Sequence, residues 1–176
     1  MLYVQQSLGP NEELVHVGHF HWMYTVNAVF SIIWGIVGSI IVIVAAVYMY
    51  KSLGKFPPNL GWLEAVRYTH PGLRIVSFLM FVMGLLSFAR LMVVKATTEI
   101  AVTNSRIIYK RGLIARYIGE INIDRIEGVN ILQTIPGRLL DYGRVAIRGM
   151  GIGEVILPPI ADPISFRRAI EKARSL

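Results

Sequence analysis

Hydrophobic residues are distributed very unevenly along the chain. Between Trp22 and Tyr50 the sequence contains no Asp, Glu, Lys or Arg. About 20 consecutive apolar residues are enough to cross the hydrocarbon core of a bilayer, and the core helix of a soluble protein rarely needs so many. The pattern therefore predicts a transmembrane helix over residues 22–50.

A second apolar block covers residues 75–89 and is followed by Arg90, four apolar residues and Lys95. The block alone makes a helix of about 22 Å, shorter than the ~30 Å hydrocarbon core. We predict a second span over residues 74–95, in which Arg74 and Arg90 extend to the lipid headgroups. Two alternatives stay open here: a buried helix of a soluble protein, and Arg90 as a functional charge within the membrane.

From Thr97 onward the pattern changes to short stretches rich in β-branched residues, which predict strands. Six are expected, at residues 97–103, 106–112, 115–123, 128–133, 143–149 and 154–158. A helix follows, with Asp162 suited to cap it and Pro163 suited to its first position. Phe166, Ile170 and Ala173 form its apolar stripe. Short strands followed by one amphipathic helix predict a small sheet or β-barrel closed at one end by that helix.

These patterns divide the chain into five segments. They are a polar lead-in (1–21), a first transmembrane helix (22–50), a connector (51–73), a second transmembrane helix (74–95) and a C-terminal domain (96–176). Prolines at 57, 58 and 71 interrupt helix in the connector. Between them the sequence fits either a short interfacial helix with Trp62 at headgroup depth or an irregular loop.

Composition and charge narrow the class of partner. Apolar residues make up 54% of the chain and charged residues 16%, which is more apolar than an ordinary soluble domain. The net charge is +7, and residues 97–176 carry the larger part of the basic surplus. Beside two predicted spans, this surplus favours contact with anionic lipid over nucleic acid, for which no sequence signature is present. The absence of cysteine excludes disulfides and thiolate metal sites.

Two local motifs suggest chemistry, but each has a simpler interpretation. His16, His19 and His21 lie close together, yet no regular helix or strand points all three to one side. We therefore interpret His21 and Trp22 as a collar at the membrane interface, and predict no metal or other cofactor. The glycine-rich segment 149–153 follows a strand but precedes another strand, so a hairpin turn is expected where a phosphate loop would need a helix.

Several phrases of the sequence resemble one known family. They are TTEIAVTNSRIIYKRGL (97–113), INIDRIEGVNILQTIPGRLLDYGRVAIRG (121–149), PIADPISFRRAIEKA (159–173) and the lead-in NEELVHVGHFHW (11–22). Together they resemble the bacterial pleckstrin-homology-like (PH-like) domain of membrane-flanked domain proteins. The resemblance implies a split, seven-stranded barrel with a C-terminal helix, anchored to the membrane. It implies no catalytic residues, and the seventh strand rests on the resemblance alone.

Recognition of a specific inositide is not expected, because the loop between the first two strands is only residues 103–105. General attraction to anionic lipid is worth about 1 kcal/mol per basic residue near the surface. The lipid-contact candidates are Arg90, Lys95, Arg106, Lys110, Arg111 and Arg116. The alternative is that the hairpin residues among them form an ordinary solvated face. The C-terminal domain has the carboxylates Asp124, Glu127 and Asp141 but no histidine or cysteine that could act with them as base or nucleophile. No enzymatic activity is therefore predicted.

The sequence thus predicts a multi-pass protein of the cell membrane, with a cytoplasmic C-terminal domain that binds or assembles without chemistry. Its partners would be lipids and either a second copy or a membrane protein. The loop at 134–143 is the candidate partner surface, through Arg138, Leu139, Leu140 and Tyr142. The alternative, packing within the domain, is favoured more for the two leucines than for Tyr142. The alternative function is a non-catalytic subunit of a transport or envelope-stress assembly that acts through its membrane helices.

Overall fold

The computed structural model describes residues 2–57, 59–113, 117–151 and 153–175. The chain forms two compact units. One unit, called here the sheet unit, joins residues 1–24 to residues 93–176. The other, the helical unit, consists of residues 25–92.

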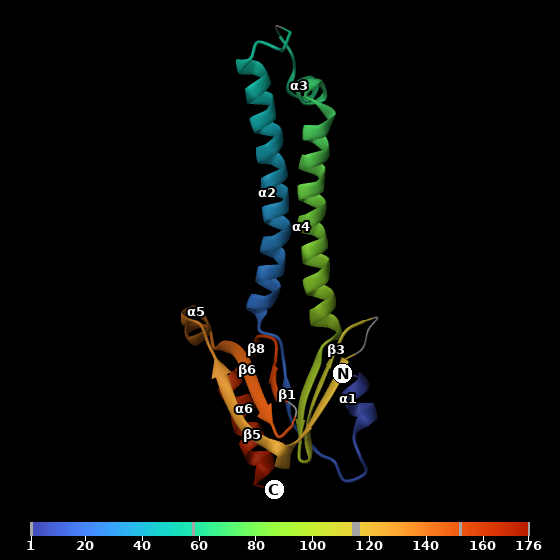
Figure 1. The fold of residues 1–176 in the computed structure, drawn as a ribbon, viewed down its shortest axis with the longest axis vertical. Coiled ribbons are helices and arrows are strands. Elements are labelled where there is room, and N and C mark those ends of the chain that lie inside the picture. Colours follow the sequence, from blue (N-terminus) through green and yellow to red (C-terminus); the bar gives the residue numbers. More distant parts are fainter. Residues whose placement is uncertain (1, 58, 114–116, 152, 176) are drawn as a thin grey trace. The chain divides into compact units, whose positions relative to one another are not determined.

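The sheet unit contains eight described strands in two antiparallel sheets (Figure 1). The first sheet has the order β1 (Leu14–Gly18), β2 (Glu99–Thr103), β3 (Arg106–Arg111) and β4 (Tyr117–Asn122). The second has β5 (Ile126–Leu132), β6 (Tyr142–Gly149) and β7 (Gly153–Ile156) in order, with β8 (Ile160–Ala161) also paired to β6. The six strands predicted from the sequence are all present.

The predicted barrel is not closed. Between the sheets, the described residues show an isolated bridge from Phe20 to Ile160 but no ladder of paired strands. A single 3-10 turn over Ile123–Arg125 carries the chain from β4 into β5 and ends the pairing of the first sheet. Side chains from both sheets, among them Ile100 and Ile147, fill one common core. Apart from this bridge, the described parts of the two sheets are held together by packing where a closed barrel would use hydrogen bonds.

Helix α6 (Pro163–Arg174) packs against strands of both sheets, as predicted. The Asp162 side chain accepts a hydrogen bond from the Ser165 amide at 2.9 Å, and Pro163 occupies the first turn. Phe166 and Ile170 are completely buried in the core, and Ala173 is buried beside them. The predicted cap and apolar stripe are both confirmed.

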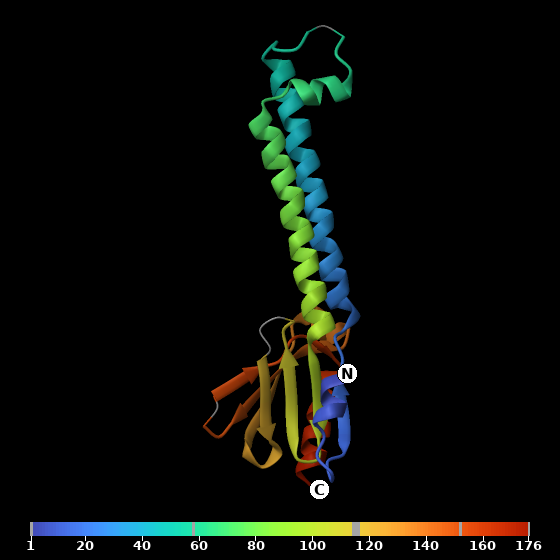
Figure 2. The ribbon, with the colours of Figure 1, turned by 90° about the vertical axis from the view of Figure 1, so that its right-hand side faces the viewer.

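The lead-in contributes structure that the sequence patterns did not predict. Its residues 14–18 form β1, which pairs with β2, a strand more than 80 positions later. Helix α1 (Leu2–Ser7) lies on the other side of the first sheet from the core (Figure 2). There Val4 is buried against Ala101 and Ile108. Both faces of β2 and β3 are thus covered, which explains their nearly continuous burial.

The helical unit is a pair of long helices joined by a loop and a short helix. Its elements are α2 (Trp22–Ser52), α3 (Trp62–Tyr68) and α4 (Pro71–Thr97). Residues 22–24 of α2 and 93–97 of α4 belong to the sheet unit. Helices α2 and α4 lie side by side and touch where Gly35 faces Gly84. A Cβ atom added to Gly84 would lie 2.7 Å from the Gly35 Cα, so larger residues would separate the helices. The Ser77 hydroxyl also donates to the Ser39 carbonyl at 2.8 Å.

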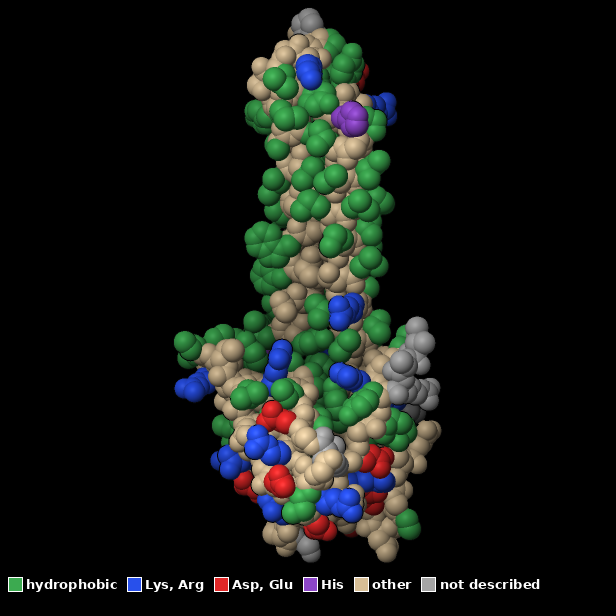
Figure 3. Space-filling model, in the orientation of Figure 1, with side chains coloured by type: hydrophobic (Ala, Val, Ile, Leu, Met, Phe, Trp, Pro, Cys, Tyr) green, Lys and Arg blue, Asp and Glu red, His purple; other side chains and the backbone are tan. Residues whose placement is uncertain are grey.

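Helices α2 and α4 are both long and apolar enough to span a membrane. Most of their large apolar side chains point outward, and Figure 3 shows hydrophobic side chains over the visible face of this helix pair. Trp34 and Met83, for example, are 69% and 68% exposed. A buried helix of a soluble protein would cover such residues, so their exposure favours an apolar surrounding for the pair.

Candidate functional site

The most extensive polar network outside the backbone ladders holds α1 and the lead-in on the first sheet. Glu99 accepts hydrogen bonds from the backbone amides of Tyr3 and Val4, both at 3.2 Å. Lys110 forms an ion pair with Glu99 at 3.1 Å and lies 5.2 Å from the centre of the Tyr3 ring. The carboxylate thus meets the amide end of the short helix, where negative charge is favourable.

The second half of the network is built around Glu12 and Arg106. The Arg106 guanidinium donates to both carboxylate oxygens of Glu12, at 2.9 and 2.8 Å, and to the Ser7 carbonyl at 2.7 Å. It also pairs with Glu120 at 2.8 Å. The same Glu12 carboxylate accepts from the Gly9 amide and the Thr103 hydroxyl. This arrangement fixes the turn between α1 and β1 on the sheet.

The network explains the pKa shifts of its members. Burial by itself raises the pKa of Glu12, but hydrogen bonds from Gly9, Arg106 and Thr103 outweigh it and lower the pKa to about 2. Glu99 behaves in the same way: the amide of Val4 and the ammonium of Lys110 overcome the effect of burial and lower its pKa. Both carboxylates are therefore ionised at neutral pH and act as structural anions.

Five of the six predicted lipid-contact residues lie within the described parts of the chain. Arg106 and Lys110 are engaged in the network described above. Arg111 is exposed at the end of β3, where its guanidinium lies 5.1 Å from the centre of the Tyr117 ring. Arg90 is exposed on α4 and Lys95 is half-buried near its end. Arg116 lies outside the described residues.

The three clustered histidines point to different surroundings. The His16 ring meets the edge of Phe166, with 5.8 Å between ring centres. The ring of His21 is buried and stacks on Tyr142 at 5.0 Å. Burial lowers the pKa of His16. The charge of Asp162 raises this pKa, and that of His19 lowers it further. Within the described parts of the chain, no three His, Asp or Glu side chains gather in a way that would hold a metal ion.

Residues 134–143, called here the α5 loop, form a short rigid projection. Helix α5 (Ile135–Leu139) begins at Thr134, whose side chain accepts from the Gly137 amide at 3.3 Å. Gln133 donates to the Tyr142 carbonyl at 3.2 Å, which ties the two ends of the loop together. Gly137 packs so closely that an added Cβ would lie 2.6 Å from that carbonyl oxygen. The loop therefore presents its outer side chains from a fixed backbone.

The α5 loop presents apolar side chains outward. Ile135 and Leu139, four positions apart on one face of α5, are 80% and 81% exposed. Tyr142 is half-buried by its stacking on His21. The expected order of burial, in which Leu139 and Leu140 pack within the domain more than Tyr142 does, is therefore wrong, since both leucines are exposed. The sequence signal for the exposed pair is Thr-x-Pro at 134–136, which is typical of a helix start. A helix that begins there places Ile135 and Leu139 on the same side.

A hollow of about 580 Å³ adjoins the α5 loop and reaches α6. It is lined by the apolar side chains of Leu132 and Ile164 and by the basic side chains of Arg138 and Arg168. Arg167 and Glu171 also line it and form an ion pair at 2.9 Å. The surface thus combines exposed apolar side chains with an excess of positive charge.

The polar groups of α2 and α4 are mostly satisfied by the helices themselves. The hydroxyls of Ser31 and Ser39 donate to the carbonyls of Ala28 and Ile36, at 2.7 and 2.8 Å. Ser77 joins α4 to α2 through the bond to Ser39. The Ser31 and Ser39 hydroxyls thus bond within α2, and the Ser77 hydroxyl links the two helices.

Comparison of the sequence with models of protein families identifies the family to which this chain belongs. The model described as "Bacterial PH domain" matches residues 14–174. The chain belongs to the bacterial PH domain family. The match begins at the first residue of β1, so the bacterial PH model takes in the lead-in strand, both long helices and the sheets. None of the curated proteins and none of the solved structures matches the chain. Family membership supports a non-catalytic binding module.

Proposed function

We propose that this bacterial PH protein is a membrane-anchored binding module that assembles with a protein partner at an anionic membrane surface. In this proposal α2 and α4 cross the membrane and the sheet unit lies in the cytoplasm. The support for anchoring is the outward exposure of large apolar residues along both helices.

The covalent connections support a position close to the headgroups. Helix α4 ends at Thr97 and β2 begins at Glu99, so a single residue links them. At the other connection, three residues separate β1 from the first residue of α2 at Trp22. Two such short links leave little free chain between the proposed spans and the sheet unit. Exposed basic residues such as Arg111 add attraction to anionic lipid.

One observation carries the assembly proposal: Ile135 and Leu139 stand almost fully exposed on a loop whose backbone is fixed by Gln133 and Gly137. Ordering such residues costs little on binding, because the loop is already rigid, and burying them against a partner is favourable. The neighbouring Arg138 and Arg168 favour a partner surface with acidic residues. The partner is a second copy of this chain or another membrane protein.

Cysteine crosslinking tests this proposal, and the chain has no native cysteine to interfere. Arg138→Cys and Leu139→Cys should each give a dimer or a heterologous adduct in native membranes. Lys172→Cys, exposed on α6, is the matched control and should remain monomeric. If the two loop variants yield only monomer, or if Lys172→Cys crosslinks equally well, the α5 loop is not the contact surface.

A further inference from the structure

A second hollow lies in the helical unit, where the chain turns from α2 into α3. Its volume is about 610 Å³. It is lined by Val47, Tyr48 and Lys51 of α2, Phe56 of the loop, and Trp62 and Ala65 of α3. Pro57, Asn59 and Leu60 complete the lining. The wall therefore combines aliphatic and aromatic side chains with one amide and one ammonium group.

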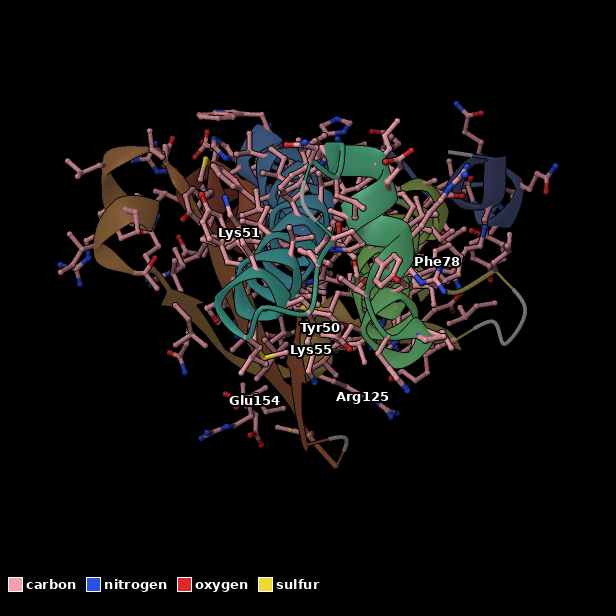
Figure 4. The ribbon with its side chains drawn as sticks, turned by 90° about the horizontal axis from the view of Figure 1, so that it is seen from above. Tyr50, Lys51, Lys55, Phe78, Arg125 and Glu154 are labelled. Carbon is pink, nitrogen blue, oxygen red and sulfur yellow. The ribbon has the colours of Figure 1, made fainter. Side chains whose placement is uncertain are left out.

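The charge around this hollow is positive. Figure 4 shows Lys51 and Lys55 near the end of α2, where Lys55 lies 5.5 Å from the centre of the Tyr50 ring. In the described part of the chain Lys51 has no ion pair within 4.0 Å. The carboxylate of Glu64 does not line the hollow and accepts from the Gly61 amide at 3.4 Å. An anion that entered the hollow would thus meet Lys51 without competition from a lining carboxylate.

The surface beside the hollow is suited to the boundary between headgroups and acyl chains. Trp62 and Leu63 are 53% and 78% exposed on the short helix α3, and Leu53 and Tyr68 are exposed nearby. Exposed Trp and Tyr next to apolar residues are typical of this boundary. If α2 and α4 span the bilayer as proposed above, the turn that connects them lies at this depth.

We propose that this hollow binds an anionic phospholipid from the surrounding bilayer. The lipid phosphate would bind the Lys51 ammonium, while the glycerol and the upper acyl chains would contact Val47, Phe56 and Trp62. A zwitterionic choline lipid fits less well, because its quaternary ammonium would lie near Lys51 and no lining carboxylate would compensate it. The inference rests on the proposed membrane anchoring. It adds a lipid site, formed by α2, the connecting loop and α3, at one end of the pair of long helices.

Fluorescence quenching in vesicles tests the site with the full-length protein. Trp22→Phe and Trp34→Phe leave Trp62 as the single tryptophan. The protein is placed in mixed phosphatidylglycerol and phosphatidylcholine vesicles in which one lipid or the other carries bromine near the headgroup end of its acyl chains. Brominated phosphatidylglycerol should quench Trp62 more strongly than brominated phosphatidylcholine at the same mole fraction.

The substitution Lys51→Gln should lower this preference for phosphatidylglycerol about five-fold, the effect of one basic residue at an anionic surface. Lys172→Gln in the sheet unit is the charge-matched control and should leave the preference unchanged. Equal quenching by the two lipids, no quenching at all, or an equal effect of both lysine substitutions would overturn the inference.

A second single-tryptophan variant separates the two proposals. Trp34 lies in the middle of α2 and is exposed, so with Trp22→Phe and Trp62→Phe it should be quenched by deeply placed bromine whatever the headgroup. Quenching of Trp34 without lipid preference at Trp62 would reject the lipid site alone. Absence of quenching at both positions would reject membrane anchoring itself.

Discussion

The ion pair between Glu12 and Arg106 provides the sharpest test of how the lead-in is held on the sheet. The perturbation is Glu12→Gln, which keeps the size of the side chain and removes its charge. The Glu12 side chain is only 7% exposed, and its carboxylate accepts a bidentate pair from Arg106 as well as bonds from Gly9 and Thr103. Charge-assisted bonds of this kind are about twice as strong as neutral ones.

The expected loss of stability in Glu12→Gln follows from the lowered pKa of Glu12. The fall of the Glu12 pKa from 4.5 to about 2 corresponds to about 3 kcal/mol in favour of the folded state. Arg106 is 25% exposed and keeps Glu120 as a second partner, so solvent and Glu120 recover part of this energy. We therefore expect Glu12→Gln to destabilise the pairing of β1 with β2 by about 2 kcal/mol.

Hydrogen exchange followed by mass spectrometry, on the full chain in mild detergent, measures this directly. A loss of about 2 kcal/mol lowers amide protection in β1 and β2 about 30-fold. Glu120→Gln is the control: its partner Arg106 keeps Glu12, so the loss should stay below about 1 kcal/mol. Equal losses in the two variants would show that the bidentate pair is not what holds the lead-in.

The same pair predicts a pH dependence with a definite sign. The pKa of Glu12 is lower in the folded state, so its contribution is complete above about pH 4.5 and disappears as the pH falls toward 2. Glu99 and Asp162, whose pKa values are also lowered, add to the loss in the unmodified protein. The difference in β1 protection between the unmodified protein and Glu12→Gln should therefore shrink over this range. A difference that stays constant from pH 5 to pH 2 would contradict the assignment.

Two further predictions concern the core and the topology. Phe166→Ala removes a fully buried ring and should destabilise the sheet unit by about 3–5 kcal/mol, measured by denaturant titration of the full chain. Ile164→Ala, at an exposed position of the same helix, is the control and should cost under about 1 kcal/mol. Similar values for both variants would refute the packing role of α6. Reporter fusions at residue 60 and at the C-terminus should report opposite sides of the membrane, and agreement between them would reject the two-span arrangement.

Local sequence patterns were sufficient for the elements whose signals lie within a few residues. Asp162 and Pro163 marked the start of α6, and the spacing of Phe166, Ile170 and Ala173 marked its buried face. The uninterrupted apolar stretch from Trp22 likewise indicated one long helix. In each case the hydrogen bonds and the periodicity involved are local, so neighbouring residues determine the outcome.

The tertiary structure alone decided the features that depend on distant partners. The lead-in looked like a polar approach to the first helix, but β1 completes a sheet with β2 and Glu12 finds Arg106, 94 positions later. Arg106 looked like a surface charge until the fold placed it under α1. The sequence led to the wrong order of burial for Leu139 and Tyr142, because the stacking of Tyr142 on His21 depends on how β6 meets the end of the lead-in. Strand register and side-chain pairing over such separations are determined by the whole packed core, which no short window of sequence contains.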